Sequence, residues 1–182
     1  PLCGQVTSGR SAPEPVTAVF ESAGSWLPAG LTQVERGLQE AVENEGPLTP
    51  DALATLKAGG KRMRPMLVLL CAGPDGVEAA VRPAVAVEMI HMASLVHDDV
   101  LDRAPLRRGR PTVFARSGRD RATALGDRLF AGAFALLAEN GETSAISELS
   151  DTAVDPARGE LMQRRGAFDM SLPERDYLER CR

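Results

Sequence analysis

The fold of this chain is decided by one apolar stretch that ends in carboxylates, His91-Met-Ala-Ser-Leu-Val-His-Asp-Asp-Val-Leu-Asp102. No Gly or Pro lies between Ala84 and Ala104, so the pattern predicts one long buried helix. At about 100° per residue, Asp98 and Asp102 are one turn apart and share a face, with His91 two turns earlier on nearly the same stripe. Asp99 points about 100° away from Asp98.

The acidic side chains of this stretch have two explanations. Burying bare carboxylates costs free energy unless their charge is offset. In one interpretation they belong to a helix end and are solvated or paired with Arg103, Arg107 and Arg108. In the other, Asp98 and Asp102 bind Mg²⁺, which takes hard oxygen ligands and usually combines one or two carboxylates with waters and substrate phosphates. Taken alone, the stretch leaves both interpretations open.

Length and composition narrow the class of protein. The chain has 182 residues, of which 43% are hydrophobic, which is enough for one domain with a core. A net charge of −4 argues against a general nucleic-acid binder. Cys3, Cys71 and Cys181 form no CxxC pair, so we expect reduced thiols and a cytoplasmic protein. No signal peptide or 18-residue apolar run is recognised, and no membrane span is expected.

Helical spacing of apolar residues predicts further helices on both sides of the central stretch, and no segment shows strand alternation. We expect residues 1–14 to be a flexible arm and residues 15–182 to belong to a single all-α domain. The expected elements are helices at 15–27, 31–42, 49–58 with Thr49 as N-cap, 66–72, 120–138 and 144–165, the last continuous or broken near Pro156; a turn at 73–76; a loop at 105–119; and a helix starting in a capping box at 171–174.

Two basic clusters accompany the acidic helix. Lys61, Arg62 and Arg64 precede one predicted helix, and Arg107 and Arg108 begin five residues after the last aspartate. Guanidinium forks match phosphate oxygens, and Lys supplies a point charge. Each cluster alone fits a solvated charged loop. Together with carboxylates suited to Mg²⁺, they suggest a diphosphate substrate.

Five motifs in a fixed order carry a resemblance to a known family. They are Gly60-Lys-Arg-Met-Arg-Pro65, Glu88-Met-Ile-His91, His97-Asp-Asp-Val-Leu-Asp102, Arg107-Arg-Gly-Arg-Pro-Thr112 and Gly126-Asp-Arg-Leu-Phe130. In this order the chain resembles the trans-polyprenyl diphosphate synthases, best the long-chain bacterial type, from about Leu31 onward. The resemblance implies an all-α, isoprenoid synthase-type helical bundle with a central cavity. It also implies a prenyltransferase that condenses an allylic diphosphate with isopentenyl diphosphate.

The resemblance also assigns roles to individual residues. The implied assignments are isopentenyl diphosphate binding by Lys61, Arg64, His91 and Arg108; Mg²⁺ binding by Asp98 and Asp102; allylic diphosphate binding by Arg107; and a cavity-facing side chain for Gln163 of Gly159-Glu-Leu-Met-Gln163. Asp98, Asp102 and Arg107 would then be the catalytic residues.

Control of product length is assigned to Ala93 and Ser94. Ser94 lies only about 40° from the face of Asp98, whereas Ala93 is about 140° away, so the role of Ala93 rests on the resemblance. Short-chain members carry a bulky aromatic residue five positions before the first aspartate; this chain has two small residues. We therefore expect a geranylgeranyl or longer product, with simple helix packing as the alternative for Ala93.

The chain also departs from the family pattern. The family's Lys-Thr pair and second aspartate-rich motif are not found, and Asp151-Thr-Ala-Val-Asp155 is interpreted as a solvated helix or turn. We expect these residues to be the N-terminal part of the enzyme, truncated and inactive alone, or to need a partner chain. Non-catalytic subunit, degenerate homologue and class I terpene cyclase are the alternatives. The resemblance further implies a homodimer, with 120–138 and 144–165 as interface candidates.

Overall fold

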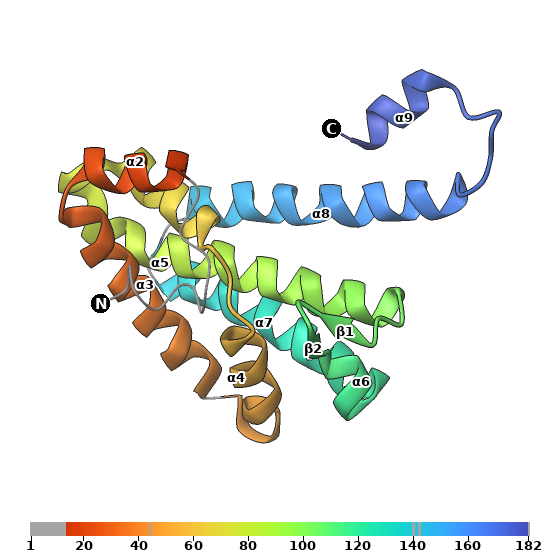
Figure 1. The fold of residues 1–182 in the computed structure, drawn as a ribbon, viewed down its shortest axis with the longest axis horizontal. Helices are drawn as coiled ribbons and strands as arrows, with labels where there is room; N and C mark the ends of the chain where they lie inside the picture. The colour runs from red at the N-terminus through yellow and green to blue at the C-terminus, as the bar shows by residue number, and fades with distance from the viewer. Residues whose placement is uncertain (1–13, 44, 140, 142, 182) are drawn as a thin grey trace. The chain divides into compact units, whose positions relative to one another are not determined.

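The computed structural model describes residues 14–43, 45–139, 141 and 143–181, so the expected arm lies almost wholly outside the described residues. The regular elements of the described part are helices apart from one two-stranded hairpin, which confirms the all-α class. Contacts divide the chain into two compact units, Pro1–Asn140 and Gly141–Arg182. The elements are α2 Glu14–Ala23, α3 Trp26–Glu43, η1 Gly46–Leu48, α4 Thr49–Lys57, α5 Met63–Leu101, β1 Leu106–Arg107, β2 Arg110–Pro111, α6 Val113–Ser117, α7 Arg119–Glu139, α8 Thr143–Arg165 and α9 Glu174–Arg180 (Figure 1).

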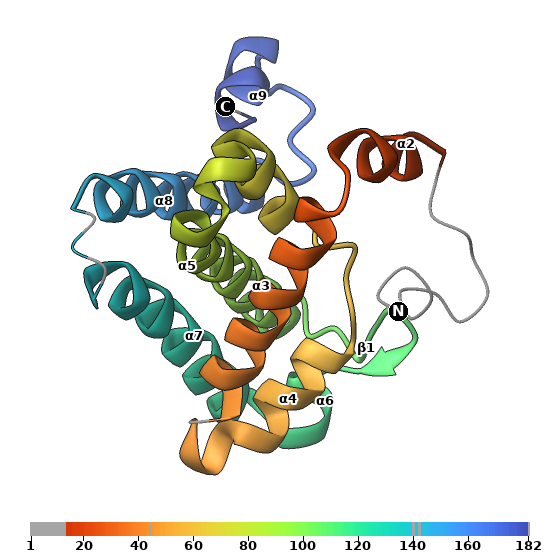
Figure 2. The same ribbon diagram turned by 90° about the vertical axis from the view of Figure 1, so that its left-hand side faces the viewer.

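Helix α5 is the centre of the first unit and packs mainly against α3 and α7 (Figure 2). The side chains that meet there are apolar and fully buried, which removes each from water at a gain of about 1.5–3 kcal/mol. They include Val34, Leu38, Leu69, Met89, Leu125 and Leu129. The long central helix expected from the sequence is therefore confirmed, and it is longer than expected.

A kink at Gly73 replaces the turn expected at residues 73–76. Gly73 has φ 69° and ψ 177°, a conformation that only glycine adopts at little cost. Pro74 follows directly and so falls in the first turn after the kink, where its missing N–H has no helical partner to lose. The two helices expected before and after this point are consequently one kinked element.

Helix α5 ends in a Schellman motif without glycine. The N–H of Ala104 donates to the carbonyl of Asp99 over 3.0 Å, and that of Arg103 donates to Val100 over 3.4 Å. Arg103 occupies the left-handed position with φ 51°, which costs a non-glycine residue about 1–2 kcal/mol. Asp102 stays helical before it, with its N–H 2.8 Å from the carbonyl of Asp98, so the two aspartates keep helical register.

The segment after α5, expected as a loop without strands, contains a hairpin and a short helix. Strands β1 and β2 pair antiparallel with Arg107 opposite Arg110. Arg108 and Gly109 between them have φ of 52° and 76°, as a type I′ turn requires. Thr112 then caps α6 by accepting a hydrogen bond from the N–H of Ala115 over 3.0 Å. Two-residue strands are too short to show alternation, so the sequence pattern missed them.

Two expected helix starts differ, and one open alternative is decided. Thr49 is not an N-cap, because η1 runs directly into α4 and Thr49 already has helical φ and ψ of −49° and −45°. The capping box at Ser171 does not form: the hydroxyl donates to Asp169 over 2.6 Å, and Pro173 is the N-cap of α9. Helix α8 is continuous from Thr143 to Arg165, with no break near Pro156.

Helix α5 also corrects the expectation about apolar runs. By length and composition alone it could cross a membrane, and half of its apolar window is buried inside the protein. This is weak evidence for a span, because a core helix passes the same test.

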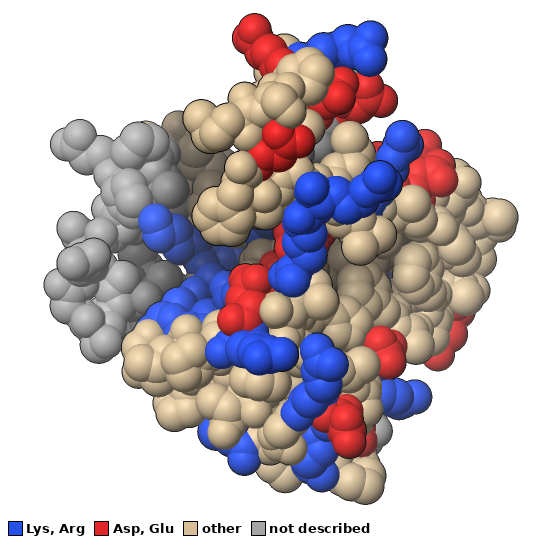
Figure 3. Space-filling view, turned by 90° about the vertical axis from the view of Figure 1, so that its right-hand side faces the viewer, with Lys and Arg blue, Asp and Glu red and all other residues tan. Residues whose placement is uncertain are grey.

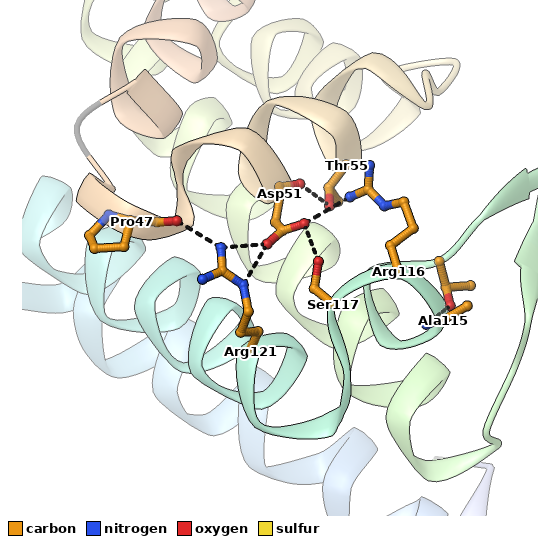
Figure 4. A network of polar contacts seen from close by, with 8 residues as sticks. Pro47, Asp51, Thr55, Ala115, Arg116, Ser117 and Arg121 are labelled. Carbon is orange, nitrogen blue, oxygen red and sulfur yellow. Dashed lines mark hydrogen bonds and ion pairs between the residues drawn. The ribbon is translucent and has the colours of Figure 1, made fainter.

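Asp51 joins α4 to the segment that follows the hairpin (Figure 4). Its buried carboxylate accepts hydrogen bonds from Arg116 over 3.0 Å and Ser117 over 2.8 Å, and from two nitrogens of Arg121 over 3.1 and 2.9 Å. Only 7% of the side chain is exposed. Because α6 directly follows β2, this cluster anchors the far end of the segment that carries Arg107 and Arg108.

We expect Asp51→Asn to lower the free energy of unfolding of the full-length protein by about 2 kcal/mol, because two guanidiniums lose a buried counter-charge. The loss stays moderate because Arg116 and Arg121 are 39% and 44% exposed and partly solvated. Urea unfolding followed by circular dichroism measures the effect. Asp151→Asn, an exposed position on α8, is the control and should change little. Equal losses in both variants would contradict the anchoring role.

Candidate functional site

The two predicted metal ligands lie at the C-terminal end of α5. Asp98 is half-buried, Asp102 is exposed, and helical register places both on one face. Among the described residues, no group of three or more His, Cys, Asp or Glu side chains could hold a metal ion. Two hard-oxygen donors one turn apart instead fit a cation that completes its shell with water and phosphate oxygens. Mg²⁺ has this preference, so these residues fit it.

Asp99 has a different role from its two neighbours. It is buried and accepts a hydrogen bond of 2.8 Å from Nε of Arg107. Burial raises the pKa of Asp99, the hydrogen bond and charge of Arg107 lower it, and the charge of Asp102 raises it, with a net increase. The paired-acid interpretation is thus confirmed for Asp99. The bond uses Nε only, and it holds the predicted allylic contact Arg107 beside the end of α5.

The basic cluster at the start of α5 divides into exposed and withdrawn side chains. Lys61 and Arg64 are exposed, as a substrate contact requires. Arg62 between them instead pairs with Glu35 of α3 and Glu88 of α5. Its φ of 48° is left-handed, which costs about 1–2 kcal/mol for a residue with a Cβ. The charge pattern grouped the three residues together, and only the resemblance left Arg62 without a substrate role; the structure separates Arg62 from the other two by its ion pairs.

The two basic segments converge on His91. The pKa of this half-buried histidine is lowered to about 4, first by burial and then by the positive charges of Arg64, Arg108, Arg107 and Arg62. Residues that are remote in sequence therefore act on one imidazole, which is neutral at pH 7. Figure 3 shows that one face of the molecule carries both basic and acidic side chains on its surface.

The lowered pKa of His91 predicts a pH-dependent stability. Between about pH 6.5 and 4 the unfolded chain binds a proton at this site that the folded protein resists, so stability falls as pH falls through this range. His91→Gln removes the titration, and the variant should lose less stability than the parent between pH 7 and 5. Urea unfolding of both proteins at the two pH values measures this. Parallel losses would show that His91 titrates normally.

The other predicted residues are less closely connected to this cluster. Ala93 is fully buried, so within the first unit it packs against neighbours, and its product-length role stays a prediction. Ser94 is half-buried, and its hydroxyl donates to the carbonyl of His91 over 2.9 Å. Gln163 is exposed on α8 in the second compact unit and stays a prediction from the resemblance.

A contact that the sequence did not reveal joins two of the five motifs. The ring of His97 stacks on Phe130 of α7 at 5.6 Å, and its Nε2 lies 3.2 Å from a carboxylate oxygen of Asp127. A Cβ placed on Gly126 would lie only 2.1 Å from the same Nε2. His97, the residue before Asp98, therefore packs against α7 at the position where Gly126 has no side chain. Both motifs were visible in the sequence, but no spacing rule pairs them.

Comparison with solved structures agrees with this geometry. A decaprenyl diphosphate synthase from Rhodobacter capsulatus matches 85% of this chain and 49% of its own, with TM-score 0.78 and 33% identity. A polyprenyl synthase from Caulobacter crescentus CB15, complexed with calcium and isoprenyl diphosphate, matches 87% of this chain and 51% of its own, with TM-score 0.76 and 34% identity. The fold and site therefore define an all-α protein of the isoprenoid synthase type.

Sequence comparison identifies the family. The polyprenyl synthetase family model matches residues 48–182. Component 2 of the heptaprenyl diphosphate synthase of Geobacillus stearothermophilus is 47% identical over 161 residues, 87% of this chain and 50% of the relative. The chain belongs to the polyprenyl synthetase family, as the five motifs predicted. It spans about half the length of the curated relatives that it matches.

Proposed function

We propose that the protein condenses an allylic diphosphate with isopentenyl diphosphate to give a polyprenyl diphosphate of geranylgeranyl length or longer. The observation that carries this proposal is that the two basic segments meet beside the helix of Asp98 and Asp102: Nη1 of Arg62 and Nη1 of Arg108 would lie 3.1 and 3.4 Å from a Cβ placed on Gly60. His91 is seven residues from Asp98, or about 10 Å along a helix. Cations from both basic segments therefore surround His91, and the carboxylates follow further along the same helix, which suits two diphosphates and a divalent metal ion.

The proposed roles follow from charge and exposure. Lys61, Arg64, His91 and Arg108 would bind isopentenyl diphosphate, and Arg107, held by Asp99, would bind the allylic diphosphate. Asp98 and Asp102 would hold Mg²⁺, which supplies positive charge to the diphosphate group as it leaves. Calcium in the Caulobacter crescentus structure supports a divalent cation here.

In the proposed reaction, the carbon–oxygen bond to the allylic diphosphate breaks and the arginines stabilise the departing anion. The isopentenyl double bond then attacks the allylic carbon, and a proton leaves the new chain. Apolar helix faces would keep water from the allylic carbocation that forms when the carbon–oxygen bond breaks. The small residues Ala93 and Ser94 would leave room for a long product.

The assembly of the protein belongs to the same proposal. A homodimer through residues 120–138 and 144–165 is the first candidate, and gel filtration of the full-length protein tests it. Two relatives are named as component 2 of a heptaprenyl diphosphate synthase, which favours a second candidate, in which a different partner chain takes part. The exposed free thiols of Cys71 and Cys181 support a cytoplasmic location.

The function is tested by Arg64→Ala in the full-length protein. Loss of a charge-assisted hydrogen bond to phosphate should raise the KM for isopentenyl diphosphate about 10- to 100-fold, with little change for the allylic substrate. Arg82→Ala is the matched control, because Arg82 is 51% exposed on α5 and makes only a 4.0 Å ion pair with Glu139. An effect confined to the allylic substrate would show that the two sites are reversed.

A further inference from the structure

Arg62 lies between Lys61 and Arg64, two proposed substrate contacts, but is itself not one of the proposed contacts with either substrate. Its Nε donates to one carboxylate oxygen of Glu35, and its Nη2 lies 3.4 Å from the other. Its Nη1 donates to Oε1 of Glu88 over 3.0 Å. Carboxylates from α3 and α5 therefore hold one guanidinium at all three of its nitrogens.

This ion cluster is largely withdrawn from water. The side chains of Arg62 and Glu88 are 14% and 5% exposed, and Glu35 is 34% exposed. Burial lowers the pKa of Arg62, but the hydrogen bonds and charges of Glu35 and Glu88 raise it by more, with a net increase. Buried charges persist only when paired, so the cluster depends on all three members.

The backbone at Arg62 sets the direction in which the chain enters α5. Arg62 is the N-cap of α5, with φ 48° and ψ 36° and no side-chain cap. Left-handed conformations at residues other than glycine persist where the surrounding structure holds them. Here the ion pairs of the side chain hold the backbone of Arg62 in place. Because Lys61 precedes Arg62 and Arg64 follows two residues later, the directions of both side chains depend on that backbone.

Gly60 places this cluster beside the hairpin. A Cβ on Gly60 would lie 3.1 Å from Nη1 of Arg62, 3.4 Å from Nη1 of Arg108 and 3.8 Å from Oε1 of Glu88. The guanidiniums of both basic segments therefore approach the same glycine as the Glu88 carboxylate. Glu88 is also three residues before His91 on α5, so this buried acid lies close to two of the proposed contacts with isopentenyl diphosphate, His91 and Arg108.

We propose that Arg62 is a positioning residue: held by Glu88 and Glu35, it fixes the start of α5, with Lys61 just before the helix and Arg64 in its first turn, in the conformation that binds isopentenyl diphosphate. Arg62 itself does not contact the substrate. The inference rests on the proposed function. It adds that an ion cluster of Arg62, Glu35 and Glu88 orients the isopentenyl diphosphate site, one of the two proposed substrate sites.

The test compares Arg62→Ala, Arg62→Lys and the isosteric Glu88→Gln in the full-length protein. We expect Arg62→Ala and Glu88→Gln each to raise the KM for isopentenyl diphosphate about tenfold, with kcat and the allylic KM changed less than about threefold. Arg62→Lys keeps the charge without the fork and should recover part of the loss. The double variant Arg62→Ala/Glu88→Gln should have a KM for isopentenyl diphosphate no higher than that of either single variant, because the effects of substitutions in residues that act as a unit are not additive. Arg82→Ala should match the parent.

Several results would overturn the inference while leaving the proposed function intact. One is an unchanged KM in Arg62→Ala; another is an equal effect on both substrates. An effect of Arg62→Ala without one of Glu88→Gln would make Arg62 a direct ligand. Failure of Glu88→Gln to fold would make the cluster purely structural. If the parent protein does not condense the substrates, the proposed function fails, and calorimetry with inorganic pyrophosphate decides the inference separately: Arg62→Ala should weaken binding about tenfold, and equal affinity would overturn it.

Discussion

Replacing Asp98 or Asp102 by asparagine in the full-length protein should reduce turnover by about three orders of magnitude or more. Both carboxylates lie on one face at the end of α5, and they fit a cation that is shared with phosphate oxygens. Asparagine keeps the size and one oxygen but removes the charge that holds the ion. Losing metal-based stabilisation of a departing group costs several kcal/mol, which corresponds to this reduction in rate.

Steady-state kinetics at several Mg²⁺ concentrations measures the effect, and excess Mg²⁺ should restore part of the activity of either variant. Asp75→Asn provides the control, because Asp75 is exposed near the kink at Gly73 and far along α5 from the site. Near-normal turnover in Asp98→Asn or Asp102→Asn would remove these residues from the metal site. The circular dichroism spectra of all variants should match the parent.

The central helix and its neighbours were predictable because their signal is local. Apolar residues such as Val34 and Leu38 repeat at helical spacing, and packing around α5 buries them as the pattern implied. The helix termini were less predictable. Arg62, Arg103 and Arg108 adopt the left-handed conformation where sequence rules expect Gly or Asn, so nothing marked the turns that they form.

The site was predictable in its residue types but not in its pairing. The motifs predicted the exposed basic residues and the helix face of Asp98. In the structure, the charges of Arg64 and Arg107 both lower the pKa of His91. The sequence offered Arg107 as one of three possible partners for the aspartates, but it did not single out Asp99 as the one that binds it. It gave no sign that Arg62 is withdrawn into ion pairs. These partners come from elements up to 27 residues apart, and contacts over such distances are set by packing rather than by spacing.

Gly126→Ala should destabilise the full-length protein by about 3 kcal/mol, although alanine normally favours a helix over glycine by about 1 kcal/mol. The reason is steric. The added Cβ would lie 2.1 Å from Nε2 and 2.3 Å from Cδ2 of His97, far inside van der Waals contact. The imidazole cannot simply turn away, because it is stacked on Phe130 and lies against Asp127.

Gly132→Ala on the same helix is the matched control. Its Cβ would meet only the terminal methyl of Met89 at 2.8 Å, and a flexible methionine can move aside. We expect this variant to be neutral or more stable by up to about 1 kcal/mol. Urea unfolding of both variants therefore gives opposite signs if the packing of His97 decides the outcome. Because His97 precedes Asp98, Gly126→Ala should also lower kcat by displacing the metal-binding end of α5. Equal stability of the two alanine variants would show that His97 is free to move and that the two motifs are not joined at Gly126.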